Sequence, residues 1–314
     1  MTGGAVLAGV DIGGTTTLAV LSDGGPRPLA TTRLATPAAQ GGAAMLAAAA
    51  SAVRTLLADT GTPATALAGV GVGAAGVIDP DTGRVLAASD SFRDWVGTDV
   101  NQELSGLLGG CPVWTDNDVN AFLLGELAAG EQPAPRHAMA ITLGTGVGGA
   151  LLVDGVLLHG GPAGAGEIGH VGRFGDRRCT CGQIGHLEAY ASGRSLGRRY
   201  TEATGQERTA AAVAEAARAG DADALRIYRE AGRFLGEAIA TGCGLLGVDL
   251  AVVGGSVVRS WPLLADAVTR VLRERPLLTG EPVRVRPGVL GEYAVAIGAA
   301  ALALARIGGV PASR

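Results

Sequence analysis

Short apolar runs separated by glycine-rich turns form the beginning of the chain. Residues Val6–Leu21 contain two such runs, joined at Gly13-Gly14, a pair that permits positive φ. They predict a strand, a tight turn and a second strand. The alanine-rich stretch Ala38–Leu57 predicts a helix, and the apolar run Leu67–Val72 predicts a further strand that ends in another glycine turn. The predicted order is strand, strand, helix, strand.

The same pattern recurs in residues 137–153, where two apolar runs flank a Gly/Thr turn and precede the turn Asp154-Gly155. Two such units predict an internal duplication, with coincidence in a chain of 52 glycines as the alternative. We expect an α/β fold of two lobes, each opened by a β-hairpin, with a cleft between the two glycine turns. The expected lobes are residues 1–118 and 119–314, and a C-terminal helix at about 297–314 is expected to pack back on the first.

The second half of the chain predicts further helices and one strand. Apolar positions from Leu225 to Ile239 step by three or four after Asp221, a candidate N-cap, and so predict a long amphipathic helix. Leu250–Val253 predicts a strand that leads into a turn at Gly254-Gly255-Ser256. Helices are predicted at about 261–273 and 294–305.

Charge and apolar length limit the partners. The chain has 25 basic and 29 acidic residues, so its net charge of -4 gives no electrostatic reason to expect a nucleic acid or an anionic membrane. Its apolar stretches carry a charge, as at Arg54, or are shorter than a membrane span requires. No basic leader is evident, and four cysteines are too few for a disulfide scaffold, so we expect reduced thiols and a cytoplasmic location.

All 25 basic residues are arginine. The absence of lysine excludes three mechanisms, because a P-loop NTPase, a protein kinase and a Schiff-base enzyme each need a lysine amine. If the protein uses ATP, its phosphates must be held in another way.

The two glycine turns offer such a way. In Asp11-Ile-Gly-Gly-Thr-Thr16, backbone N–H groups and threonine hydroxyls can bind phosphate oxygens, and the carboxylate at the end of the strand can hold hydrated Mg²⁺. Leu143–Gly149 can supply the opposing half of a phosphate clamp. Ordinary hairpin turns are the alternative, and they explain one motif more easily than two.

A polar cluster, Thr115–Asn120, precedes an amphipathic helix. Asn117, Asp118 and Asn120 lie where a strand gives way to a helix N-terminus, whose dipole favours an ionised carboxylate. Asp118 is therefore a candidate general base. Helix capping by Asn120 or Asp118 is the alternative for one of these residues.

Two cysteines and two histidines lie within seventeen positions and form a complete tetrahedral ligand set for Zn²⁺. The predicted ligands are His170, Cys179, Cys181 and His186. Chance clustering is the alternative, and a disulfide is disfavoured because the Cys-x-Cys loop is too short. Glu167 precedes His170 by three and Glu188 follows His186 by two, so a bound metal would fix both carboxylates. The other two histidines, His137 and His159, flank strands and have no identifiable partner.

Together these motifs resemble bacterial sugar kinases of the ROK family, and glucokinase-like members in particular, over nearly the whole chain. The resemblance implies the two-lobed actin-like ATPase fold of sugar kinases, with Mg²⁺ and ATP as cofactors and a structural Zn²⁺. It assigns ATP and phosphate contacts to Asp11, Gly13, Gly14, Thr15, Thr16, Gly144, Thr145, Gly146, Gly254 and Gly255. It assigns sugar contacts to Asn117, Asp118, Glu167, His170, Glu188, Gly76 and Ser91.

The sequence departs from the family pattern at two places. His186 stands where the zinc motif has its third cysteine, a change that keeps a metal-binding side chain. Ser91 stands where similar kinases carry an asparagine that contacts the sugar, and a hydroxyl reaches less far than an amide. This second departure bears on which sugar is bound.

The resemblance implies transfer of the γ-phosphoryl group of ATP to the 6-hydroxyl of a hexose, most simply glucose, with Asp118 as the base, and it suggests a homodimer or homotetramer. One alternative is a kinase for an amino sugar, an N-acyl hexosamine such as N-acetylmannosamine, or a sugar-like cyclitol. A sugar-sensing repressor of the same family is disfavoured, because ten residues precede Asp11 and no basic patch is evident. An actin-like ATPase without a sugar would not account for the residues between Glu167 and Glu188.

Overall fold

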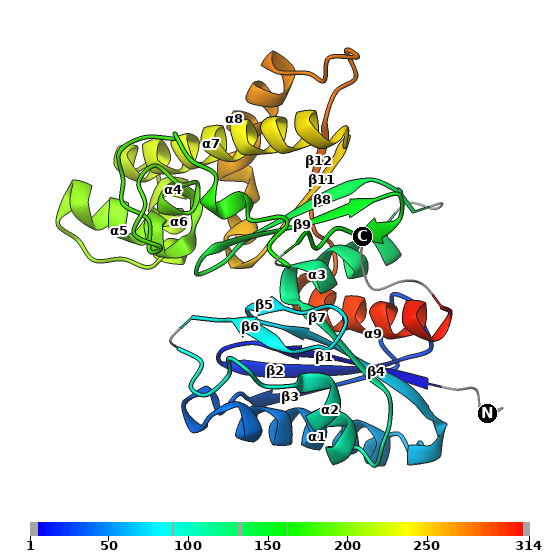
Figure 1. Ribbon diagram of the computed structural model, residues 1–314. Helices are drawn as coiled ribbons and strands as arrows, with labels where there is room; N and C mark the ends of the chain where they lie inside the picture. The colour runs from blue at the N-terminus through cyan, green and yellow to red at the C-terminus, as the bar shows by residue number, and fades with distance from the viewer. Residues whose placement is uncertain (1–5, 90, 131–133, 162, 310–314) are drawn as a thin grey trace. The chain divides into compact units, whose positions relative to one another are not determined.

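The computed structural model describes residues 6–89, 91–130, 134–161 and 163–309 (Figure 1). The chain divides into two compact units. Unit 1 comprises Met1–Arg136, Leu152–Ala165 and Val289–Arg314, and unit 2 comprises His137–Leu151 and Gly166–Gly288. The expected lobe boundary at residues 118 and 119 stays a prediction.

Unit 1 is built on a five-stranded sheet with the order β3-β2-β1-β4-β7. Its strands are β1 (Val6–Ile12), β2 (Thr16–Ser22), β3 (Ala30–Ala35), β4 (Leu67–Ala74) and β7 (Val113–Asn117). The β1 and β2 strands form the predicted antiparallel hairpin, and β4 and β7 run parallel to β1. Parallel strands end at the same edge of a sheet, so the carboxyl ends of β1, β4 and β7 lie next to one another. A two-stranded sheet of β5 (Val77–Ile78) and β6 (Val85–Ala87) follows β4.

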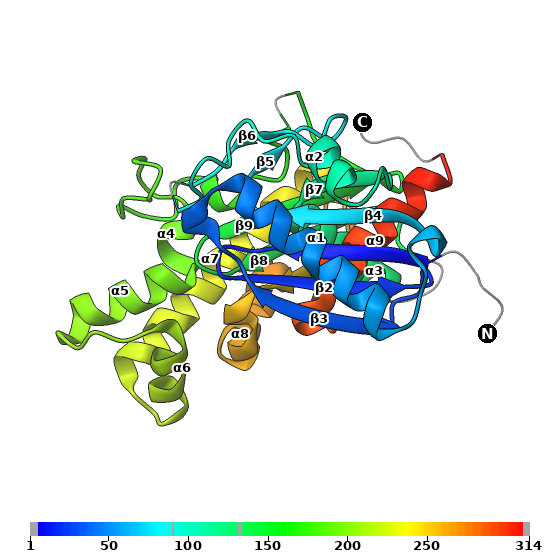
Figure 2. The ribbon, with the colours of Figure 1, turned by 90° about the horizontal axis from the view of Figure 1, so that it is seen from below.

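Helices cover both faces of this sheet. Figures 1 and 2 show α1 (Gly42–Asp59) crossing one face beside α2 (Val100–Leu107), while α3 (Asp118–Ala128) and α9 (Ala294–Ile307) cover the other. Two glycines allow α9 to approach the strands closely. A Cβ atom at Gly71 of β4 would lie 1.7 Å from the carbonyl oxygen of Ala299, and one at Gly9 of β1 would lie 1.9 Å from that of Ala296. The C-terminal helix therefore packs directly on β1 and β4 in unit 1.

The α1 helix is long and apolar enough to span a membrane by length and composition. Its inward side chains, among them Met45, Leu46 and Val53, are fully buried and pack in the core of unit 1. This arrangement is typical of a core helix in a folded domain.

Unit 2 repeats the arrangement of unit 1, an antiparallel hairpin followed by strands that run parallel to the first strand of that hairpin. Its strands are β8 (Ala138–Leu143), β9 (Val147–Val153), β11 (Leu250–Gly254) and β12 (Arg284–Pro287). The β8 and β9 strands form an antiparallel hairpin, and β11 and β12 run parallel to β8. The last two residues of β9, Leu152 and Val153, pair with β10 (Val156–Leu157) in unit 1. The hairpin followed by parallel strands confirms the predicted α/β fold with a duplicated, hairpin-opened sheet.

The helices of unit 2 are mostly consecutive in the chain. They are α4 (Glu188–Ala191), α5 (Gly193–Thr204), α6 (Ala210–Arg218), α7 (Ala222–Leu246) and α8 (Trp261–Glu274). Asp221 caps α7 through its side chain, as predicted, because its Oδ1 accepts the N–H of Ala224 at 2.8 Å. Short 3₁₀ turns occur at Ala38–Gln40, Ala64–Ala66, Ile168–His170, Ser256–Ser260 and Gly291–Tyr293.

Candidate functional site

Two carboxylates meet at the carboxyl edge of the sheet in unit 1. Asp11 lies near the end of β1, and Asp118 begins α3 directly after β7. Burial, with a smaller contribution from the charge of Asp118, raises the pKa of Asp11 to about 8. Burial raises the pKa of Asp118 to about 6, although hydrogen bonds from Val119 and Asn117 act in the opposite direction. At neutral pH the first carboxyl therefore holds a proton more readily than the second.

Asn117 caps the helix that Asp118 begins. Its Oδ1 accepts the N–H of Val119 at 2.8 Å, and its Nδ2 donates to the carbonyl oxygen of Gly76 at 2.8 Å. The sequence-based expectation that Asn120 or Asp118 is the cap was wrong, because the strand runs on through Asn117 and puts this residue at the helix boundary. Gly76 has φ +116, and a Cβ atom there would lie 2.4 Å from the carbonyl oxygen of Ala87. A side chain at position 76 would therefore disturb the backbone whose carbonyl Asn117 binds.

The first predicted phosphate loop, Gly13–Thr16, is closed by a bond from the N–H of Gly13 to the carbonyl oxygen of Thr16 at 3.1 Å. Gly14 and Thr15, at its tip, are exposed. A Cβ atom at Gly14 would lie 3.3 Å from the ring of Phe92, which belongs to the segment that carries Ser91. Ser91 is exposed, and its hydroxyl hydrogen-bonds that of Ser89 at 2.6 Å.

The second predicted phosphate loop, Gly144–Gly146, lies in unit 2 and is one residue tighter. The N–H of Gly144 donates to the carbonyl oxygen of Gly146 at 3.0 Å, and the N–H of Gly193, at the start of α5, donates to that of Gly144 at 2.8 Å. Gly255 packs against the strand that leads into this loop. It has φ +84, and a Cβ atom there would lie 2.4 Å from the carbonyl oxygen of Leu143. Gly254 ends β11 directly before it.

A cavity of about 660 Å³ opens beside the second loop, entirely within unit 2. Its lining includes Gly144, Thr145, Ser256 and the cationic side chains of Arg194, Arg198 and Arg208. Sequence reasoning did not identify these arginines, because they follow no motif. The spacing of two of them was a usable signal, since Arg194 and Arg198 on α5 are four residues apart and so share a helix face.

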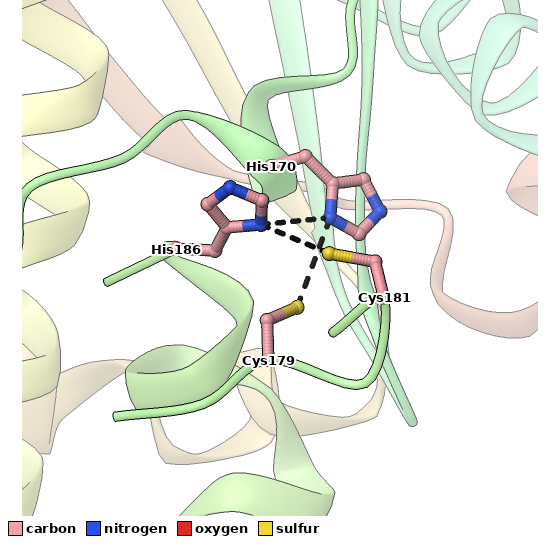
Figure 3. A group of neighbouring side chains, drawn as sticks. All are labelled: His170, Cys179, Cys181 and His186. Atoms are coloured by element: carbon pink, nitrogen blue, oxygen red, sulfur yellow. Dashed lines mark hydrogen bonds between the residues drawn. The ribbon is translucent and has the colours of Figure 1, made fainter. Parts of the chain in front are cut away.

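The four predicted metal ligands come together in unit 2, where their ligand atoms all lie within 4.8 Å of one another. Figure 3 shows both Nδ1 atoms and both sulfurs pointing toward one centre. The Nδ1 atoms of His170 and His186 are 3.3 Å apart, Cys181 Sγ is 3.3 Å from His186 Nδ1, and Cys179 Sγ is 3.8 Å from His170 Nδ1. Tetrahedral Zn²⁺ has bonds of about 2.0 Å to nitrogen and about 2.3 Å to sulfur, which give edges of roughly 3.3–3.8 Å. The donor set and its size therefore fit zinc.

The predicted sugar-binding carboxylates of unit 2 lie beside this metal group. Glu167 precedes a 3₁₀ turn, and its Oε2 is 3.8 Å from Nε2 of His170. Glu188 is held on both oxygens: Oε2 accepts the N–H of Val147 at 3.1 Å, and Oε1 accepts the hydroxyl of Thr180 at 2.5 Å. The other predicted sugar-binding residues, Asn117, Asp118, Gly76 and Ser91, belong to unit 1.

The repeated hairpin-opened sheets, each with a Gly/Thr turn in its first hairpin, together with the carboxylate pair at the edge of the first sheet, define a protein of the actin-like ATPase fold. The sequence model of the ROK family matches residues 7–306 of this chain. The chain therefore belongs to the ROK family, as the sequence motifs predicted.

Known relatives agree with this placement. A glucokinase of Halalkalibacterium halodurans is 34% identical over 278 residues, which cover 83% of each chain. A kanosamine kinase of Amycolatopsis mediterranei is 33% identical over 250 residues, covering 79% of this chain and 80% of the relative. The crystal structure of a ROK family glucokinase from Streptomyces griseus in complex with glucose and AMPPNP has a TM-score of 0.78 at 31% identity, covering 96% of this chain and 99% of that one.

Proposed function

We propose that the protein transfers the γ-phosphoryl group of ATP to the 6-hydroxyl of a hexose, with glucose as the leading substrate and Asp118 as the general base. Its class, an ATP-dependent sugar kinase, follows from membership of the ROK family and from its relatives. The observation that carries the finer proposal is the carboxylate of Asp118 at the start of α3, with its pKa raised to about 6.

This carboxylate suits the removal of a hydroxyl proton. A general base works best when its pKa lies near the operating pH, because it is then ionised yet still basic. Burial raises the pKa of Asp118 from that of an ordinary aspartate toward neutrality. Asn117, next to it, has a second amide N–H to offer a sugar oxygen, since only one is needed for Gly76.

The phosphates of ATP are assigned to the two glycine loops. The exposed tip of the first loop, at Gly14 and Thr15, presents backbone and hydroxyl donors. The cavity beside the second loop has the size of a nucleotide pocket, and Arg194 and Arg208 on its wall provide cations for an anionic ligand. Gly254 and Gly255 would border the adenosine.

Mg²⁺ fits the carboxylate pair of unit 1. Two neighbouring carboxyls repel one another when both are ionised, which is why the charge of Asp118 contributes to the raised pKa of Asp11. A hard divalent cation neutralises such a pair and accepts carboxylate oxygens. It would supply charge neutralisation of the phosphates, and Asp11 would hold it through water.

In unit 2, Glu167, His170 and Glu188 are assigned to the sugar hydroxyls, and the zinc ion to the group His170, Cys179, Cys181 and His186. A closed set of four protein ligands is typical of a structural site. The zinc would hold the loop that carries these residues and take no part in proton transfer. We further predict a homodimer or homotetramer in the cytoplasm, and a role at the entry of sugars into glycolysis.

A kinase for an amino sugar, an N-acyl hexosamine or a cyclitol is the second candidate. It is favoured by Ser91, whose short hydroxyl is exposed and bonded to Ser89 rather than extended. The identity of 33% to a kanosamine kinase, against 34% to the glucokinase of Halalkalibacterium halodurans, is consistent with this candidate. One altered polar contact can shift discrimination between sugars by about 10²-fold or more.

The test is an ADP-release assay with ATP and Mg²⁺ on glucose, mannose, glucosamine, N-acetylglucosamine, N-acetylmannosamine, kanosamine and a C7 cyclitol. Asp118→Asn is the inactive control, and Ser91→Asn is the specificity variant. Turnover of glucose that Asp118→Asn abolishes supports the leading proposal. Turnover of an amino sugar that Ser91→Asn shifts toward glucose supports the second candidate. No turnover on any sugar would favour a sensing role without catalysis.

A further inference from the structure

His159, for which the sequence suggested no partner, forms a hydrogen bond with the buried carboxylate of Asp116. It lies two residues beyond β10 in unit 1 and is 3% exposed. Its Nε2 lies 2.8 Å from Oδ2 of Asp116, which is 1% exposed. The His159 Nδ1 atom is buried and has no hydrogen-bond partner among the described residues. Nε2 is thus the ring atom through which His159 acts.

The other oxygen of Asp116 is bonded to the start of α3. Oδ1 accepts the backbone N–H of Asn117 at 2.7 Å and the side-chain amide of Asn120 at 2.7 Å. Three donors on a carboxylate buried away from water satisfy it as fully as a buried acid requires. The guanidinium of Arg306 on α9 also interacts electrostatically with Asp116.

These bonds fix the point where β7 becomes α3. Asn117 is held through its backbone by Asp116 and through its side chain by Gly76 and Val119, and Asp118 follows it directly. A general base must lie within hydrogen-bond reach of the proton that it removes, and a misplacement of about 1 Å can cost roughly 10²-fold in rate. The position of the Asp118 carboxylate therefore depends on the orientation of the Asp116 side chain.

We propose that His159 is a positioning residue for the phosphoryl transfer. It holds the Asp116 carboxylate so that Oδ1 faces Asn117 and Asn120, and thereby places Asp118. His159 touches neither substrate nor reacting atom in this scheme. The inference rests on the proposed role of Asp118 as the base.

A purely structural role is the competing explanation, because a buried histidine and aspartate can simply stabilise a fold. The two explanations differ in what a partial replacement does. A glutamine at position 159 can place its amide N–H near the position of the His159 Nε2 atom and so reach Asp116. The shorter asparagine places its amide only near the position of the His159 Nδ1 atom, which contacts no described partner. Gln and Asn are otherwise similar in polarity, so they form a matched pair.

The experiment compares His159→Gln, His159→Asn and His159→Leu with the unchanged protein, measuring kcat and KM for ATP and for the best sugar of the panel. We expect His159→Gln to keep kcat within about threefold, and the other two to lose roughly 10- to 100-fold in kcat with each KM within about threefold. The melting temperature is measured for each variant. Should His159→Leu fail to fold, the Gln and Asn pair still decides.

Amide hydrogen exchange over residues 113–123 provides a readout that does not need turnover. We expect faster exchange at Asn117 and Val119 in His159→Asn than in His159→Gln. Equal kcat in the two, or a loss that appears in KM alone, would overturn the proposal. If the unchanged protein phosphorylates no sugar, the proposed function fails, and the exchange result still decides whether His159 orders this segment.

Discussion

The carboxylate of Glu188 accepts the backbone N–H of Val147 at 3.1 Å, directly after the second predicted phosphate loop, and its other oxygen accepts the hydroxyl of Thr180. Thr180 lies between Cys179 and Cys181, two of the predicted metal ligands. One side chain therefore joins the predicted phosphate loop of unit 2 to the loop that carries the predicted metal ligands. Disturbing either end should move this carboxylate.

Gly146→Ala should displace Glu188. A Cβ atom at Gly146 would lie 2.6 Å from Oε2 of Glu188, so the flexible carboxylate must move and give up its bond to Val147. We expect a loss of about 1 kcal/mol in the free energy of unfolding, as for one hydrogen bond. If Glu188 contacts the sugar as proposed, KM for the sugar should rise by roughly tenfold.

Gly144→Ala is the matched control, because no atom of the described residues lies within 4 Å of a Cβ atom at that position. Its stability without ligands should equal that of the unchanged protein, as thermal unfolding can show. Equal destabilisation by both substitutions would mean that backbone flexibility of the loop, and not the Glu188 contact, determines the effect.

The metal group should bind one Zn²⁺ per chain, measured by elemental analysis of the purified protein. His186→Ala removes a ligand that is 5% exposed and should abolish the zinc, while His186→Cys should keep it, because a thiolate is an equally suitable ligand. Chelation should lower the melting temperature of the unchanged protein, since metal that binds only the folded state stabilises it.

Cys111→Ser is the control for thiol chemistry elsewhere, because Cys111 lies outside the metal group, in unit 1. It should keep a full equivalent of zinc. Retention of zinc by His186→Ala would show that the remaining three residues suffice, and would remove His186 from the proposed ligand set.

The pH dependence of activity should follow the ionisation of Asp118. Its pKa is raised to about 6, so below that pH the base is protonated and kcat/KM should fall about tenfold per pH unit, with a plateau above pH 7. Asp118→Asn should lose about 10²- to 10⁴-fold in kcat and show no such limb. A limb in the unchanged protein near pH 4 would mean that Asp118 is as accessible to water as an ordinary aspartate.

Contiguous signals made much of the fold predictable. The two hairpins, the helix after Asp221 and the clustered metal ligands each depend on residues close together in the chain, and the structure contains all of them. Strand β3 was not predicted, because its half-buried and exposed positions alternate without a strong apolar run. The bond between His159 and Asp116 spans 43 residues, and only the folded chain shows it.

Folding stability should decrease with rising pH because of the same carboxylates that the proposed reaction uses. The pKa of Asp11 is raised to about 8 and that of Asp118 to about 6, whereas both are near 3.8 in an unfolded chain. Between these values the folded state binds more protons than the unfolded state, so the free energy of unfolding falls as pH rises from about 4 to about 8.

Asp11→Asn removes the buried ionisable group and should raise the melting temperature at pH 8, with little change at pH 4, where the wild-type carboxyl is already protonated in the folded state. Asp23→Asn, at an exposed turn after β2, is the control and should leave both values unchanged. A melting temperature of Asp11→Asn that equals the unchanged protein at pH 8 would show that Asp11 ionises without cost and is not held near a second carboxylate in solution.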